Sequence, residues 1–260
     1  MKPQRPGESA GVAAIVLAAG LGKRMRSDLP KVLHPARGRP LVAHVLDAVR
    51  AAGIERVVVV VGHQAERVRA ALSAPVLEWA LQRPQLGTGH AVQQTRELFA
   101  GYAGDVLVLC GDTPLLRPGT LRELIDTHRT TRAAATVLTA TLADPTGYGR
   151  VLRGADGEVL RIVEERDASP SQKAVREINS GLYVFAAPDL FAALAQVRAD
   201  NAQGEYYLTD TLAILRRAGK RVSAWCCPDA REVLGVNDPQ QLLEVEAILA
   251  QQEKDTVRDG

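Results

Sequence analysis

The sequence has 260 residues, of which 46% are hydrophobic and 24% are charged, a balance that is ordinary for a soluble globular protein. The formal net charge of +2 excludes a general polyanion-binding surface, so we expect no nucleic-acid partner and only a local site for phosphate. The longest apolar stretches, such as residues 57–61, are too short to cross a bilayer, and we expect no membrane partner.

The N-terminus and the cysteines bear on the cellular location. Residues 1–11 lack the apolar core of a signal peptide, which predicts a disordered tail. The three cysteines, Cys110, Cys226 and Cys227, have no metal-ligand spacing, and an adjacent pair makes a poor disulfide. We therefore expect a reducing, cytoplasmic compartment.

Predicted strands and helices alternate through the first half of the chain. Short apolar runs predict strands at 12–17, 56–61, 76–81, 105–109 and 134–141. Apolar residues at helical spacing predict helices at 40–52, 66–72, 89–99 and 118–129. This order predicts an α/β protein with a Rossmann-like, open and mostly parallel sheet flanked by helices. Ligands of such sheets bind beyond the carboxyl ends of the strands.

The second half of the chain changes character. Strands at 150–153 and 159–163 flank an Asp-Gly turn, which predicts a β-hairpin and a small sub-lobe. The remaining predicted elements are a strand at 178–185, helices at 188–198 and 207–218, a strand at 222–226 and a helix at 239–253. No linker rich in Gly, Pro or Ser is present, so we expect one domain over 12–253, followed by a C-terminal tail over 254–260.

The stretch LAAGLGKRMRSDLPK, residues 17–31, is the most informative part of the sequence, and we call it the glycine loop. It follows the first strand, begins with small residues and carries four cations, Lys23, Arg24, Arg26 and Lys31. Small residues let a backbone approach a ligand closely, and cations neutralise phosphate charge. A basic run of this kind is also consistent with a solvated surface. Neither the Walker pattern nor GxGxxG is present.

The glycine loop fills every fixed position of the pattern L-A-A-G-x-G-x-R-M…P-K. In this respect the sequence resembles the sugar nucleotidyltransferases, in which the loop surrounds the triphosphate of a nucleotide. The resemblance implies that Arg24 and Lys31 are catalytic, because they neutralise charge around the phosphorus under attack. It also implies that the nucleotide is bound by Leu17, Ala18, Ala19 and Gly20.

A second polar loop follows the predicted strand at 76–81. Its sequence, QRPQLGTGH over residues 82–90, begins with a glutamine that offers both a donor and an acceptor to a pyrimidine edge. The alternative is a plain strand–helix connection in which Thr88 caps the helix. The loop resembles the QxxxLGTGHA motif of N-acetylglucosamine-1-phosphate uridyltransferases, which contacts uracil. The resemblance implies that Gln82, Gly87 and Thr88 bind the nucleotide.

A candidate metal ligand follows the strand at 105–109. Asp112 precedes Pro114, where a carboxylate suits Mg²⁺ but is also common as a turn former. The family resemblance implies that Asp112 and Asn237 hold Mg²⁺ and that Gly111 contacts the nucleotide. Cys110 departs from the family, which more often has Tyr at this position.

Four further stretches match the same family, namely DPTGYGR at 144–150, INSG at 178–181, NAQGEYYLTD at 201–210 and GVND at 235–238. Each of them alone is consistent with a turn or a helix cap. Together they resemble the uridyltransferase domain over about residues 12–250, with the hairpin as a sugar-binding sub-lobe. The resemblance implies sugar contacts by Gly149, Glu164, Asn179, Tyr207 and Thr209.

The expected reaction follows from the resemblance. UTP and N-acetylglucosamine 1-phosphate give UDP-N-acetylglucosamine and pyrophosphate by Mg²⁺-dependent, in-line attack of the sugar phosphate on the α-phosphorus. A phosphate dianion needs no general base, so His34, His63 and His90 are not candidate catalytic groups. Positioning and charge neutralisation would carry the catalysis.

Two alternatives stay open. One is the same chemistry on another sugar 1-phosphate or with dTTP, and the other is a catalytically silent nucleotide-sugar sensor. The sensor predicts loss of Arg24, Lys31 or Asp112, and all three are present. The bifunctional relatives also carry an acetyltransferase β-helix built from hexapeptide repeats, which this sequence lacks. We therefore expect no acetyltransferase domain and a monomer or weak homo-oligomer.

Overall fold

The structure is a computed structural model that describes residues 11–72 and 76–258. In these ranges one mixed sheet of nine strands forms the centre of the fold. Seven strands lie in the order β11-β7-β10-β6-β1-β4-β5, and the hairpin β8–β9 is attached to β10. Their bounds are β1 Val12–Ala18, β4 Arg56–Val61, β5 Leu77–Leu81, β6 Asp105–Cys110, β7 Ala135–Thr141, β8 Arg150–Arg153, β9 Val159–Val163, β10 Glu177–Ala186 and β11 Val222–Cys226.

Most of the neighbouring pairs along the seven-strand order are parallel, as the sequence predicts. Strand β1 runs parallel to β4 and β6, β4 to β5, and β11 to β7. Strand β10 is the exception, because it runs antiparallel to both β6 and β7. The beginning of β10 therefore lies at the same edge of the sheet as the carboxyl ends of β1 and β6.

Both faces of the sheet are buried. Alternate residues of β1, β4 and β6 enter two separate apolar clusters, as expected for strands covered on both sides. One cluster includes residues of α1 (Leu41–Ala51), α2 (Ala65–Ala71) and α4 (Pro118–Thr131). The other includes residues of α3 (Thr88–Gln93), α6 (Ala187–Leu194) and α7 (Asp210–Arg217). Among the helices of the described ranges, none combines the length and the apolar character needed to cross a membrane.

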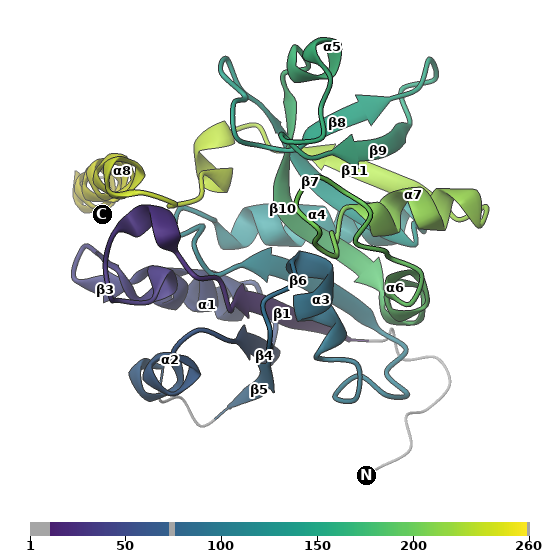
Figure 1. Cartoon of the computed structure of the whole chain (residues 1–260). Helices are drawn as coiled ribbons and strands as arrows, with labels where there is room; N and C mark the ends of the chain where they lie inside the picture. Colours follow the sequence, from purple (N-terminus) through teal and green to yellow (C-terminus); the bar gives the residue numbers. More distant parts are fainter. Residues whose placement is uncertain (1–10, 73–75, 259–260) are drawn as a thin grey trace.

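A third, smaller cluster holds the C-terminal helix α8 (Pro239–Arg258) against the glycine loop. Val236 and Val245 pack there with Met25 and Leu41, all of them buried. Figure 1 shows α8 beside the short strand β3 (Arg39–Pro40), which pairs with β2 (Pro35–Ala36), while β8, β9 and α5 (Pro170–Lys173) project from another part of the sheet. This packing brings the end of the chain to the loop after β1.

Several predicted boundaries are wrong. Helix α3 ends at Gln93 rather than near 99, because the hydroxyl of Thr95 donates to the carbonyl oxygen of Val92, and later amides bond three residues back. Helix α6 ends at Leu194, and α7 begins at Asp210 rather than at 207. Helix α8 continues to Arg258, past the expected end near 253.

Some short elements escaped prediction, and one prediction lies outside the described ranges. The unpredicted elements are β2, β3, α5 and the 3₁₀ helices Lys23–Met25, Lys31–Leu33 and Ala230–Val233. A run of two to four residues is too short to show a hydrophobic period. The expected N-terminal tail falls on 1–10, outside the described residues, except for Gly11.

Candidate active site

The glycine loop leaves β1 at the carboxyl edge of the sheet. Ala18 and Ala19 are buried at the strand end, and the carbonyl oxygen of Leu17 accepts a hydrogen bond of 2.9 Å from the amide of Gly111. Gly20 is exposed, and a Cβ there would meet nothing within 4 Å. The four residues that we expect to bind the nucleotide thus run from a fixed strand into an open backbone turn.

Gly22 is the position where the loop requires a glycine. Its φ is +61°, and an added Cβ would lie 2.9 Å from the Cβ of Lys31. The left-handed backbone lets the start of the loop pass directly beside that lysine. Arg24 is exposed next to buried Met25 and makes no hydrogen bond or ion pair with any described residue. Its guanidinium is therefore available to a ligand.

The structure brings Lys31, Asp112 and Asn237 together, although Lys31 and Asn237 lie 206 residues apart in the chain. The ammonium of Lys31 forms an ion pair with Oδ2 of Asp112 and donates to Oδ1 of Asn237 at 3.2 Å. The amide of Val236 donates to the carbonyl oxygen of Asp112 at 2.9 Å, which fixes the C-terminal segment on the end of β6.

The orientation of Asn237 suits a cation. Its amide nitrogen points toward the carbonyl oxygen of Gly235 at 3.4 Å, so its Oδ1 faces Lys31 and Asp112. Asp238 is the competing carboxylate, but it accepts from the amide of Gln241 at 2.9 Å and caps α8. Asp112 and Asn237 therefore supply the two hard oxygens that a divalent cation prefers, and the residues fit such an ion.

The described ranges hold no group of three or more His, Cys, Asp or Glu side chains that could bind a metal. A cation at Asp112 and Asn237 would therefore have only two protein side chains as ligands. Where a divalent cation has few protein ligands, phosphate oxygens and water complete its coordination shell.

The loop at 82–90 is fixed on the segment at 205–208. Gly87 has a φ of +102°, and an added Cβ would lie 2.7 Å from the carbonyl oxygen of Tyr206. The hydroxyl of Thr88 accepts from the amide of Leu208 at 3.1 Å and makes no capping bond, so the alternative of Thr88 as a helix cap is wrong.

Gln82 is buried below this loop with a defined amide orientation. Its amide nitrogen donates to the carbonyl oxygen of Gly87 at 2.9 Å and lies 3.2 Å from Nδ1 of His90. Burial lowers the pKa of His90, which favours the neutral ring that can accept this bond. The amide oxygen of Gln82, which no described residue binds, is left as an acceptor.

A cavity of about 200 Å³, which we call the inner cavity, lies beside the glycine loop. Its lining includes four of the expected sugar-binding residues and two of the expected nucleotide-binding residues, namely Gly149, Glu164, Asn179, Thr209, Leu17 and Thr88. Cys110 also lines it, and its sulfur lies 4.0 Å from the carbonyl oxygen of Gly181. Burial raises the pKa of the Cys110 thiol to about 12, so this wall of the cavity is neutral.

Glu164 gives the inner cavity its acidic group. Its Oε1 accepts from the hydroxyl of Thr209 at 3.2 Å. Burial, together with the charges of Asp210 and Asp167, raises the pKa of Glu164. Carboxyl groups with raised pKa values are common in binding and catalytic sites, where the side chain is partly buried.

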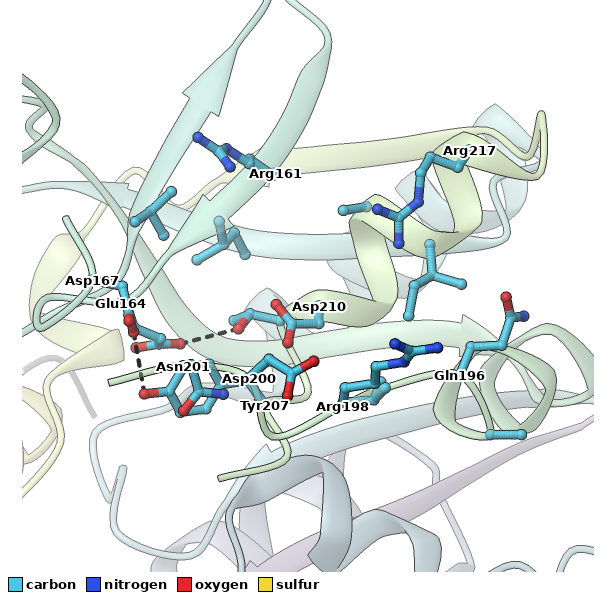
Figure 2. Close-up of a pocket in the computed structure, with 17 residues that line it drawn as sticks. Arg161, Glu164, Asp167, Gln196, Arg198, Asp200, Asn201, Tyr207, Asp210 and Arg217 are labelled. Carbon is cyan, nitrogen blue, oxygen red and sulfur yellow. Dashed lines mark hydrogen bonds between the residues drawn. The ribbon is translucent and has the colours of Figure 1, made fainter. Parts of the chain in front are cut away.

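Tyr207, the remaining residue that we expect to bind the sugar, does not line the inner cavity. It lines a neighbouring cavity of about 890 Å³, the outer cavity, which shares Glu164 and Thr209 with the inner one. Figure 2 shows Tyr207, Asp167 and Glu164 at one end of the outer cavity, with Arg198, Arg217 and Gln196 toward the other. The hydroxyl of Tyr207 accepts from Gln203 at 2.7 Å and lies 3.3 Å from Asp167.

Sequence reasoning missed Arg150, which supports the wall of the inner cavity. Arg150 is 1% exposed, forms a 2.8 Å ion pair with Glu165 and donates to the carbonyl oxygen of Tyr148. The amide of Gly147 also donates to Glu165, at 3.3 Å. Together these bonds fix the turn that carries Gly149. An arginine at the start of a hairpin strand gives no sequence signal of burial.

An α/β sheet with a glycine loop and a lysine–carboxylate pair at its carboxyl edge is the framework of a nucleotidyltransferase. A sequence model of the MobA-like NTP transferase domain matches residues 14–222, and the chain belongs to that family.

Several relatives with curated names share about half of their residues with this chain over the matched region. The chain is 54% identical over 238 residues to "Bifunctional protein GlmU" of Pelotomaculum thermopropionicum, covering 92% of this chain and 52% of the relative. It is 53% identical over 238 residues to the protein of the same name from Syntrophotalea carbinolica, covering 92% and 51%. The chain thus spans about half the length of the curated relatives it matches.

A solved structure shows the same fold at low sequence identity. It is a putative glucose-1-phosphate thymidylyltransferase from Bacillus anthracis, crystallised with sucrose. The TM-score is 0.74 at 17% identity, covering 92% of this chain and 95% of that protein.

Proposed function

We propose that this chain transfers the uridylyl group of UTP to N-acetylglucosamine 1-phosphate, giving UDP-N-acetylglucosamine and pyrophosphate. The observation that carries the proposal is the meeting of Lys31, at the end of the glycine loop, with Asp112 and Asn237. The identity of about half of all residues to relatives named GlmU supports the same assignment.

The phosphates of UTP would lie along the glycine loop. Gly20 offers an open backbone there, and Arg24 and Lys31 supply positive charge. Charge that develops on the leaving pyrophosphate is stabilised best by cations that are already in position. Without a metal, Lys31 is held in place by Asp112 and Asn237, whereas Arg24 would be ordered by the ligand.

We propose Mg²⁺ as the cofactor, held by Asp112 and Asn237. When bound, it would neutralise phosphate charge and orient the two reactants. Asp112 carries the negative charge of this site, and Asn237 adds a neutral oxygen. The attacking sugar phosphate is already an anion, so no side chain has to remove a proton from it.

The base would be held by the loop at 82–90. The amide oxygen of Gln82 can accept the N3–H of uracil, whereas cytosine has no hydrogen on N3. A buried acceptor that stays unpaired costs about 1–3 kcal/mol, so the wrong base is disfavoured by roughly tenfold to a hundredfold. Gly87 and Thr88 would present the backbone to the same ring.

The sugar would occupy the inner cavity, against Gly149, Glu164 and Asn179. Glu164 accepts hydrogen bonds from sugar hydroxyls, and Thr209 orients its carboxylate. A Cβ on Gly149 would lie 3.0 Å from Ile162 and 3.4 Å from Oε2 of Glu164, so a side chain there would fill the space beside the acid. Tyr207 would act from the outer cavity.

The test is pyrophosphate release with Mg²⁺ across UTP, dTTP, CTP, ATP and GTP, each with several sugar 1-phosphates. We expect the highest kcat/KM with UTP and N-acetylglucosamine 1-phosphate. A higher value with dTTP or with glucose 1-phosphate would correct the substrate, and no release with any pair would favour the sensor.

The metal assignment has a matched pair of variants. Asp112→Asn should lower turnover strongly at limiting Mg²⁺, because it removes the negative charge. Asp238→Asn keeps a side chain that can cap α8 and should leave turnover near that of the unmodified chain. The assignment to Asp112 is wrong if Asp238→Asn is the more damaging change.

A further inference from the structure

Strand β10 is irregular where it passes the inner cavity. The register between β10 and β7 shifts between Asn179 and Tyr183, and Gly181 adopts a φ of +81°. At this irregularity the hydroxyl of Ser180 replaces a backbone partner. It donates to the carbonyl oxygen of Leu138 on β7 at 2.7 Å and accepts from the amide of Leu182 on its own strand. An irregularity of this kind changes the direction of a side chain, which here is that of Asn179.

Both acceptor positions of the Asn179 amide oxygen are occupied. Its Oδ1 accepts from the amide of Gly181 at 3.0 Å and from the hydroxyl of Tyr183 at 2.8 Å. An amide oxygen has two lone pairs, so no further donor is accommodated well there. The amide nitrogen, with its two N–H groups, has no partner among the described residues and belongs to a side chain that lines the inner cavity.

The hydroxyl of Tyr183 acts as a hydrogen-bond donor to Asn179. Its residue is 2% exposed, and its ring packs on Phe185 with a centroid distance of 5.6 Å. Burial and the nearby charge of Glu164 raise the pKa of Tyr183 well above its usual value, so the phenol keeps its proton. The backbone amide of Gly181 can only donate, so it fixes the Asn179 oxygen on this side, and the hydroxyl of Tyr183 donates to the same oxygen.

We propose that Tyr183 is a positioning residue that holds Asn179 with its NH₂ group toward the sugar. This inference rests on the proposed function. It makes the inner cavity selective for a sugar 1-phosphate that presents an acceptor oxygen at Asn179, either a hydroxyl or an acyl carbonyl. A sugar that presents only a charged ammonium at that point meets a donor and is disfavoured.

The test is a double-mutant cycle on the KM for the sugar 1-phosphate, run with whichever sugar gives the highest kcat/KM. Tyr183→Phe keeps the ring and removes the hydroxyl, so KM should rise about threefold to tenfold while kcat and the affinity for UTP change less than twofold. In the Asn179→Ala background the same change should have no further effect, because Tyr183 acts through Asn179.

Tyr102→Phe is the matched control. The hydroxyl of Tyr102 donates to the carbonyl oxygen of Gly11 at the amino-terminal end of β1, away from the cavity, and its loss should leave KM unchanged. The proposal is overturned if Tyr183→Phe leaves KM unchanged, or if its full effect persists without Asn179. A different preferred sugar corrects the proposed function alone, since the cycle remains measurable, whereas no turnover with any sugar overturns both.

Discussion

The ion pair between Lys31 and Asp112 makes a prediction about stability that needs no substrate. The two side chains are only 19% and 12% exposed, so the pair is largely withdrawn from solvent. A hydrogen bond to a charged group contributes about 1.5–3 kcal/mol, and breaking a fully buried pair costs about 3–5 kcal/mol. Because Asn237 stays as a partner of Lys31, we expect Asp112→Asn to lower the free energy of unfolding by about 2 kcal/mol.

For a chain of this size, that loss lowers Tm by roughly 4–8 °C. The assay is thermal unfolding followed by circular dichroism at pH 7, without metal or nucleotide. Asp47→Asn is the control, because its pair with Arg39 is 49% and 53% exposed and should contribute under about 1 kcal/mol. Adding Lys31→Met to Asp112→Asn should recover part of the loss, since it removes the stranded charge. Equal Tm shifts for the two single variants would refute the reasoning.

Three further variants test other parts of the site. Gly87→Ala forces a side chain into a left-handed backbone beside Tyr206, so it should lower stability by about 1–3 kcal/mol and weaken UTP binding in calorimetry; unchanged affinity would contradict this. Glu164→Gln should raise Tm at neutral pH. Because the pKa of Glu164 is raised in the native state, that state binds more protons than the unfolded state between pH 4.5 and the native pKa, and stability falls as pH rises through that window. The variant should flatten the pH profile. Gly22→Ala pushes on Lys31 and should lower kcat far more than it raises the KM for the sugar, whereas equal effects would place the damage elsewhere.

The layers of the fold could be predicted because the central strands are buried on both faces. The valine run of β4 alternates between two apolar clusters, which is typical of a parallel strand between helix layers. The family resemblance implied that Asp112 and Asn237 hold one metal, but it did not predict that Lys31 bonds to both of them. No hydrophobic pattern places residue 237 beside residue 31.

The parts that escaped prediction depend on long-range contacts. Strand β10 gives an ordinary apolar signal, so its antiparallel direction and its register shift at Asn179 are invisible in the sequence. The same shift decides which residue bonds Asn179, and thus hides the role of Tyr183. The motif that assigns Tyr207 to the sugar does not reveal that this residue lines the outer cavity or that its hydroxyl accepts from Gln203.

The smallest apolar cluster supports both Arg24 and Asn237, two of the residues proposed to act on the phosphates and the metal. Met25 belongs to it and directly follows Arg24, while Val236 belongs to it and directly precedes Asn237. Both anchors are buried, so the exposed guanidinium and the amide oxygen share one support, to which α8 contributes Val245. Close-packed cores respond to the loss of even one methylene group. A substitution that disturbs the packing of this cluster should therefore displace Arg24 and Asn237 together. The C-terminal helix is therefore part of the machinery of the site, although none of its described side chains makes a hydrogen bond or ion pair with Lys31.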